Sequence, residues 1–205
     1  MICIDGHTVD ETLFTESGWV IDAGCRGWKF SEAIRDNKPR FAYQNWNYNQ
    51  YCIDLEMLDV PKHVEVFKQA ALTNYTGQTE CYLWGDGTAN FIKGINGTPG
   101  STEDRPVETI TVPAITLDDI YAEIGTDIDL LKLDVEGSEY LILEKFEPIP
   151  KQITVEFHQH VHPHLHSTYF PAIWERLCKN YHAVLNVEYP QYLFMDCLFI
   201  RKDLI

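Results

Sequence analysis

Short apolar runs alternate along the chain with stretches of helical spacing. The run "GWVIDAG" (18–24) ends at Asp22 and Gly24, and "FSEAIRDNKP" behind it places its apolar residues on one helical face before Pro39. A run of this length that ends in a glycine turn is typical of a buried strand. We therefore predict a strand, a tight turn and a helix.

The same periodicity continues to the end of the chain. Pro148 and Pro150 close one of the predicted helices, and another continues through Pro171. The predicted strands are "RFAYQ" (40–44), "VEVFKQAAL" (64–72), "IDLLKLDVEG" (128–137) and "QITVEFHQ" (152–159); the predicted helices lie in "QYCIDLEMLD" (50–59), "VPAITLDDIYAEIG" (112–125), "SEYLILEKF" (138–146) and "STYFPAIWERLCKN" (167–180). Two last segments, "HAVLNVEY" and "YLFMDCLFIRK", form a closing antiparallel pair. Alternating strands and helices predict an α/β three-layer sandwich with a mostly parallel sheet.

The pattern changes between the third and fourth predicted strands. "TECYLWGDGTANFIKGINGTPGS" is rich in Gly, Thr and aromatic residues, and "GDG" is a hairpin turn signal. We expect a β-hairpin and a loop inserted at about 73–112. No repeat or linker divides the chain, so we expect 1–205 to form a single domain.

Composition narrows the functional classes. The chain has 205 residues, 45% of them hydrophobic, which is enough for a packed core in one domain. A formal charge of −15, from 31 acids against 16 bases, argues against a nucleic-acid partner. No run is apolar enough to span a bilayer, and the first residues lack a signal sequence. We therefore expect a cytoplasmic protein without a membrane partner.

Acidic side chains follow the predicted strands where each strand ends. Asp22 closes the first strand, Asp134 and Glu136 close the strand at 128–137, and Glu156 and His158 close the next. Carboxylates are costly to bury, so they belong at the mouth of the sheet, where ligands of open α/β sheets bind. The strand ends therefore predict one site.

Five segments together carry a resemblance to a known family. "VIDAGCRGWKFS", "FKQAAL", "ITLDDI", "IDLLKLDVEGSE" and "ITVEFH" occur in an order and spacing similar to those of FkbM-type S-adenosylmethionine-dependent methyltransferases. The resemblance covers roughly residues 18–160. It implies a class I methyltransferase (Rossmann-like) fold, S-adenosyl-L-methionine as cofactor, and a hydroxyl of a sugar or small metabolite as acceptor.

The resemblance also assigns residues to the cofactor. The first motif supports the methionine end, the second strand offers a side chain to the ribose, a later segment flanks adenine, and Asp134 lies near the sulfonium. Gln44 stands where the ribose-binding acid is expected, and an amide makes weaker hydrogen bonds than a carboxylate. The implied cofactor-binding residues are Asp22, Ala23, Gly24, Cys25, Arg26, Gly27, Gln44, Ala70, Ala71 and Asp134.

The glycine-rich turn departs from the family pattern. Trp28 occupies the position of a glycine that falls one place earlier, at Gly27, and Arg26 replaces a small or amide residue. Arg26 either pairs with the cofactor's carboxylate or marks a pocket that has lost its cofactor. The second alternative corresponds to a non-catalytic α/β module that binds another ligand or a protein partner.

Methyl transfer to oxygen requires a base as well as positioning. The candidates are Asp134, Glu136, Glu156 and His158, and His158 has an ordinary pKa near neutrality. The run "HQHVHPHLH", which begins at His158, is equally consistent with a solvated loop and lacks an established metal-ligand spacing. We assign no metal ligands, although a divalent cation between Asp134 and Glu136 stays an alternative.

Acids in this turn also have a purely structural explanation. Glu139 follows Gly137 and a candidate Ser138 cap, so its charge favours the positive end of the helix dipole. We prefer that explanation for Glu139, whereas Glu136 precedes the glycine and can point into the cleft. The acceptor pocket is expected in "GDGTANFIKGINGTPG" and the histidine-rich segment, because loops on a rigid scaffold carry specificity.

Overall fold

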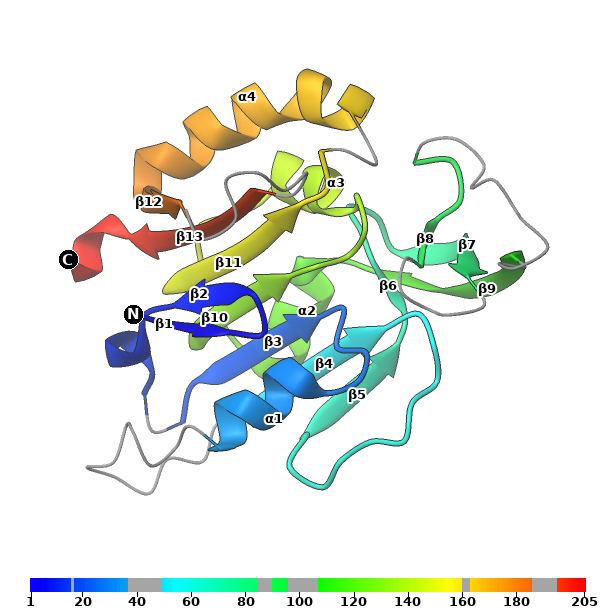
Figure 1. Cartoon of the computed structure of the whole chain (residues 1–205), viewed down its shortest axis with the longest axis horizontal. Helices are drawn as coiled ribbons and strands as arrows, with labels where there is room; N and C mark the ends of the chain where they lie inside the picture. The colour runs from blue at the N-terminus through cyan, green and yellow to red at the C-terminus, as the bar shows by residue number, and fades with distance from the viewer. Residues whose placement is uncertain (16, 37–48, 85–89, 96–106, 160–162, 186–194) are drawn as a thin grey trace.

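The computed structural model describes most of the chain (Figure 1). The residues outside this description are 16, 37–48, 85–89, 96–106, 160–162 and 186–194. The strand predicted at 40–44, with Gln44, therefore lies outside the described residues.

A seven-stranded sheet forms the centre of the molecule. Its order is β12 (Tyr181–Leu185), β13 (Met195–Arg201), β11 (Gln152–Phe157), β10 (Ile128–Leu133), β3 (Trp19–Ala23), β4 (Asn49–Asp54) and β5 (Val66–Gln69). The five strands from β11 to β5 pair in parallel, whereas β13 is antiparallel to both β11 and β12. The sheet is therefore mixed, and the expected antiparallel pairing of the last two segments is confirmed.

Strand order reverses in the middle of this sheet. From β3 the chain adds β4 and β5 on one side, and it then returns to place β10 and β11 on the other side. The chain therefore leaves the adjacent carboxyl ends of β3 and β10 in opposite directions, which makes a switch point, where open α/β sheets form a binding crevice.

Elements cover both faces of the sheet (Figure 1). Helices α2 (Leu117–Ile124), α3 (Glu139–Glu144) and α4 (Pro163–Asn180) contribute to the larger core on one face. On the other face lie α1 (Lys29–Asp36), the antiparallel hairpin of β1 (Ile2–Ile4) and β2 (His7–Val9), and the short helix η1 (Glu11–Leu13). The sequence analysis predicted neither strand of this N-terminal hairpin. A second short helix, η2 (Lys202–Leu204), follows β13.

A second, four-stranded sheet occupies the insertion. Its order is β6 (Ala71–Leu72), β9 (Val107–Ile115), β7 (Gly77–Trp84) and β8 (Phe91–Ile92), and β7 pairs antiparallel with both β8 and β9. The strand predicted at 64–72 is in fact two strands, because β5 pairs in the large sheet and β6 pairs with β9. Ala70, between them, marks the change of sheet.

The prediction of a helix at 50–59 was wrong. This segment begins inside β4, which pairs with β3 on one side and β5 on the other. Tyr51, Cys52 and Ile53 are all at most 2% exposed, since successive side chains point to opposite, covered faces of the sheet. A continuous apolar run therefore belonged to a central strand and not to one face of a helix.

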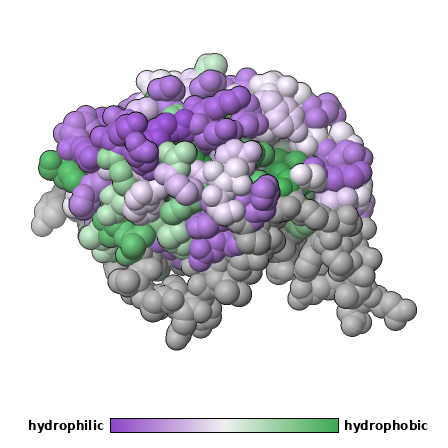
Figure 2. All heavy atoms as spheres, turned by 90° about the horizontal axis from the view of Figure 1, so that it is seen from above, coloured by the Kyte–Doolittle hydropathy of each residue, from purple (hydrophilic) through white to green (hydrophobic). Residues whose placement is uncertain are grey.

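The described surface is polar over much of its area. Seen from above, it is mainly hydrophilic with separate small hydrophobic areas (Figure 2), which agrees with the excess of acids. None of the helices in the described part of the chain has the length and apolar character that crossing a membrane requires.

Candidate functional site

A cavity of about 400 Å³ opens at the switch point of the large sheet. The turns after β3, β4 and β10 contribute to its wall, and β6 and β8 of the small sheet close the opposite side. Its lining residues are Gly24, Arg26, Ile53, Asp54, Leu55, Ala70, Ala71, Leu72, Asn90, Phe91, Ile92, Asp134, Val135, Glu136 and Ser138. Of the strand ends that the sequence analysis selected, those of β3 and β10 therefore meet at this pocket.

Gly24 shapes the pocket where β3 and β10 end. Its φ of +82° lies in the left-handed region, and a Cβ atom at this position would overlap the carbonyl oxygen of Asp134. The amide of Gly24 donates to Ile53 O at 2.9 Å, and the amide of Asp134 donates to Ala23 O at 3.2 Å. The turns after β3 and β10 are therefore in direct backbone contact, which only glycine permits.

Lys132 lies beneath this turn and connects two of the expected site acids. Its Nζ atom is 3.1 Å from Asp22 Oδ1 and 3.5 Å from Asp134 Oδ2, and it donates to Gly24 O at 2.8 Å. Both Lys132 and Asp22 are nearly fully buried. Burial would lower the pKa of Lys132, but Asp22 and Asp134 outweigh it and raise that pKa. Asp22 therefore supports the turn from behind and does not line the pocket.

The rest of the first motif contributes backbone more than side chains. Ala23 and Cys25 are buried, and Cys25 packs in a small core with Cys52. Gly27 has a φ of +75° with open space beside it, and Arg26 lines the pocket while its Nη1 atom lies 3.4 Å from Glu56 Oε1. Arg26 is thus held at the pocket rim by a carboxylate.

Trp28 does not fill the pocket. It adopts a φ of 59°, and its ring packs edge-on against Phe67 with 5.6 Å between centroids. The left-handed backbone at Trp28 directs the bulky ring into the small core around Cys52 and Val64. The Trp28 ring, at the position where the family pattern has a glycine, therefore lies outside the pocket.

Asp54 is the acid at the end of the second strand, and the sequence analysis missed it. The strand that pairs with β3 on this side is β4, which ends at Asp54. Asp54 is 8% exposed, lines the pocket, and accepts a hydrogen bond from the amide of Glu56 at 3.0 Å. Its burial raises the pKa of the carboxyl. The signal was present in "YCID", which ends in an acid as "WVID" and "KLD" do.

The four candidate catalytic residues lie together at one edge of the pocket. Nε2 of His158 is 3.3 Å from Glu136 Oε2, 3.6 Å from Glu156 Oε1 and 3.7 Å from Asp134 Oδ1. Asp134 and Glu136 also line the pocket, whereas Glu156 and His158 lie behind them. The strand ends of β10 and β11 thus form a second group of charges that adjoins the cavity.

Glu139 has a larger role than the helix-dipole explanation allowed. Its buried carboxylate accepts hydrogen bonds from the amides of Val135 and Gly137 at 2.9 and 2.8 Å, and its Oε1 atom lies 2.9 Å from His158 Nδ1. Glu139 therefore fixes both the turn and the imidazole. The prediction that the Ser138 side chain caps α3 is wrong, because this side chain makes no capping hydrogen bond.

The proximity of these groups shifts their pKa values. Burial, together with Asp134, raises the pKa of Glu136 to about 7 and that of Glu156 to about 8, against the opposing effect of His158. Burial alone would lower the pKa of His158, but the carboxylates, Glu139 first, raise it to about 10. The pKa of Asp134 lies below its usual range because cationic neighbours outweigh its burial. Ionisation of Glu136 and Glu156 is therefore disfavoured in this cluster, whereas the protonated form of His158 is favoured.

Only part of the histidine-rich segment lies among the described residues. Residues 160–162 lie outside the described residues, whereas α4 begins at Pro163 and includes His166. His166 stacks on Phe170 with 4.4 Å between ring centroids, and its Nδ1 atom lies 3.0 Å from the Tyr140 hydroxyl. His166 packs against aromatic residues of α3 and α4, so the interpretation of this segment as a solvated loop does not apply to His166.

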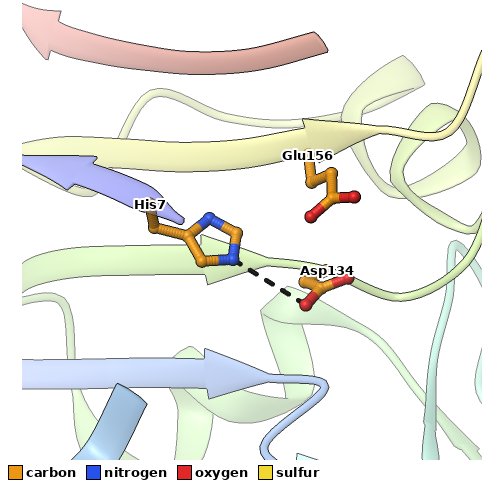
Figure 3. A group of neighbouring side chains, drawn as sticks. All are labelled: His7, Asp134 and Glu156. Atoms are coloured by element: carbon orange, nitrogen blue, oxygen red, sulfur yellow. Dashed lines mark ion pairs between the residues drawn. The ribbon is translucent and has the colours of Figure 1, made fainter. Parts of the chain in front are cut away.

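His7 joins the same cluster from the N-terminal hairpin (Figure 3). It is 2% exposed, and its Nε2 atom lies 3.7 Å from Asp134 Oδ2. Two overlapping groups in the described part of the chain have the spacing to hold a metal ion: His7 with Asp134 and Glu156, and Asp134 with Glu136 and His158. Sequence reasoning missed His7 because no strand was expected there.

Comparison with known proteins gives one match. A family model described as the methyltransferase FkbM domain matches residues 30–191, which is more than half of the chain. No match was found among the curated proteins or the solved structures. The matched range includes the turns after β4 and β10 but begins after the first motif and the N-terminal hairpin.

Proposed function

The chain belongs to the FkbM methyltransferase family, and we propose that its methyl donor is S-adenosylmethionine and its acceptor a hydroxyl of a sugar or small metabolite. The observation that carries this proposal is the pocket at the switch point, where a glycine turn, an apolar wall and three acidic side chains (Asp54, Asp134 and Glu136) face one cavity. These are the three chemical features that the donor requires.

The donor-binding residues are assigned from their places in the pocket. Asp54 accepts hydrogen bonds from the ribose hydroxyls, as an acid at the end of the second strand does in other doubly wound sheets. Ala70, Ala71 and Phe91 offer an apolar surface to adenine. Arg26, which lines the pocket, is placed to pair with the methionine carboxylate.

Asp134 and Glu136 face the reacting end of the donor. Their negative charge favours a sulfonium, which supplies an activated methyl group when the donor is bound. The acceptor oxygen forms the new C–O bond as the C–S bond breaks, and its proton leaves to a base. We assign proton removal to Glu136, which lines the pocket and lies 3.3 Å from His158 Nε2. The raised pKa of His158 keeps its imidazole protonated, and Glu139 positions that imidazole beside Glu136.

The acceptor is expected at the open side of this charged edge. Asn90 and Phe91, from the inserted segment, already belong to the pocket wall. The net charge of −15 supports a partner that is not a nucleic acid.

The alternative of a non-catalytic module rested on Trp28 and Gln44. Trp28 now gives it no support, since its ring packs outside the cavity.

Calorimetry with S-adenosylhomocysteine tests the donor assignment. We expect wild-type protein to bind it, and Asp54→Asn to bind at least about tenfold more weakly, because the charge-assisted hydrogen bonds to the ribose are lost. Asp118→Asn is the matched control, since Asp118 is exposed on α2. If wild-type protein gives no binding heat, the donor assignment is wrong; if both variants bind with equal affinity, Asp54 does not bind the ribose.

A mass-spectrometric screen for gain of one methyl group in carbohydrate and metabolite extracts then identifies the acceptor.

A further inference from the structure

Three side chains from separate elements converge beside the donor pocket (Figure 3). His7 comes from β2, Asp134 follows β10, and Glu156 lies on β11. Their ligand atoms all lie within 4.8 Å of one another. Two ligands that bind one tetrahedral metal ion at about 2.1 Å lie roughly 3.4 Å apart. The 3.7 Å between His7 Nε2 and Asp134 Oδ2 is close to that separation and longer than a hydrogen bond.

The surroundings of His7 direct its Nε2 atom at the carboxylates. The ring is 2% exposed and lies edge-on to Phe30 with 5.7 Å between centroids. Its other nitrogen, Nδ1, faces Thr154 Oγ1 at 3.5 Å. A buried histidine on the inner side of the N-terminal hairpin, aimed at two acids, has the placement of a metal ligand.

A further carboxylate, that of Asp196, lies beside Glu156 on the face of the sheet that the N-terminal hairpin covers. Asp196 pairs in register with Glu156, and its Oδ1 atom is buried without a hydrogen-bond partner among the described residues. Lys132, a buried cation on this face, is shared between Asp22 and Asp134. A divalent cation would balance charge that these side chains leave uncompensated.

His158 adds a second imidazole with the outer contact that metal-binding histidines use. Its Nδ1 atom lies 2.9 Å from the buried carboxylate of Glu139, and its Nε2 atom lies 3.6 Å from Glu156 Oε1. A carboxylate on the far ring nitrogen fixes the tautomer and the orientation of a ligating imidazole. His158 belongs to the second group of potential ligands, with Asp134 and Glu136, and Asp134 is common to both groups.

We propose that His7, Asp134 and Glu156, with His158 beside them, form a binding site for a divalent transition-metal ion of the Mn²⁺ or Zn²⁺ type. Imidazole nitrogen together with carboxylate oxygen favours these ions over Ca²⁺ and Mg²⁺. Because Asp134 also lines the donor pocket, the ion lies at the border of that pocket. Its role rests on the proposed function: as a Lewis acid it lowers the pKa of the acceptor hydroxyl. His7 lies outside the range that the family model matches.

Metal binding is measured on the full chain without methyl donor or acceptor, so that failure of the proposed function does not affect the result. The protein is stripped with EDTA and dialysed, and MnCl₂ is then titrated while free Mn²⁺ is followed by electron paramagnetic resonance. We expect one equivalent to bind. We expect His7→Gln and Glu156→Gln each to weaken binding by at least about tenfold, because each removes a ligand while keeping a polar side chain of similar size. Competition with ZnCl₂ and MgCl₂ ranks the ions.

Matched variants keep the test specific. His164→Gln and Glu175→Gln replace the same residue types at exposed positions of α4, and both are expected to bind Mn²⁺ as wild type does. Circular dichroism of every variant checks that the fold persists. The proposal is overturned by wild-type protein that binds no Mn²⁺ at millimolar concentration, or by folded His7 and Glu156 variants that bind with unchanged affinity.

Discussion

At the scale of single residues, the site depends on a close backbone contact at Gly24 that leaves no room for a Cβ atom. Gly24 brings the turn after β3 against the carbonyl of Asp134, and Lys132 below it donates to Gly24 O. This arrangement holds Asp22 and Asp134 near one cation, which offsets part of the cost of burying them. The glycine is therefore required by the scaffold before any ligand is considered.

Two glycines of the same turn give a matched test. Gly24→Ala is expected to destabilise the protein by roughly 2–4 kcal/mol, since it adds both a left-handed backbone penalty and an overlap with Asp134 O. Gly27→Ala is expected to cost only about 1 kcal/mol, because its φ is also positive but nothing lies near its Cβ position. Urea unfolding measures both free energies. Equal losses would contradict a specific contact at Gly24.

At the scale of elements, the helices that support the pocket begin in different ways. α3 begins at a turn in which Glu136 has a φ of 51° and Glu139 binds the turn amides. α2 begins with a capping box, in which Thr116 Oγ1 accepts from the Asp119 amide and the Asp119 carboxylate accepts from the Thr116 amide. The turn that begins α3 positions charged side chains, and the capping box that begins α2 adds local stability.

The capping box of α2 predicts a dependence of stability on pH. Hydrogen bonds from Thr76 and Thr116 lower the pKa of Asp119, so its stabilisation is present above the unfolded pKa and is lost as the pH falls. Asp119→Asn is expected to lower the unfolding free energy by about 0.5–1 kcal/mol at pH 7. The difference from wild type should shrink below about pH 4.

Asp118→Asn is the control for this measurement. Asp118 lies in the same helical turn and is exposed, but it makes no capping bond in the described structure. Both variants are compared with wild type by thermal unfolding between pH 3 and pH 7. An equal loss in the two variants would assign the effect to the helix dipole and not to the cap.

At the scale of the whole molecule, the N-terminal hairpin completes the layer that α1 leaves open. Ile4 and Val9 pack with Val20 and Leu130 on the face of the sheet opposite α2 to α4. β2 lies against both β11 and β13, which is how His7 reaches the acids at the ends of β10 and β11. The hairpin is therefore part of the fold and of the candidate site together.

Removing apolar contact from this hairpin tests whether it is integral to the fold. Val9 is fully buried, so Val9→Ala is expected to cost roughly 1–3 kcal/mol in the free energy of unfolding, with a single cooperative transition. Val60→Ala, at a position that is 45% exposed, should change stability by less than about 0.5 kcal/mol. A separate early transition in the Val9 variant would show that the hairpin unfolds independently.

Local sequence determined most of the elements and the general place of the site. Continuous apolar runs predicted the strands at 18–24, 128–137 and 152–159, and the acids that follow them predicted a crevice at the strand ends. These features depend on neighbours within a few residues, which the sequence displays directly. The same approach failed at 50–59, since a central strand and a buried helix share an apolar run.

Only the tertiary structure decided which residues share the site. His7 and Thr154 are 147 positions apart, and Lys132 on β10 contacts Asp22 on the adjacent β3, so no local pattern could bring these groups together. Asp54 lies at the end of the strand beside β3 because strand pairing, and not spacing along the chain, sets that position. The physical reason is that burial and charge pairing depend on the packing of the sheet and its covering layers, which form only when distant segments meet.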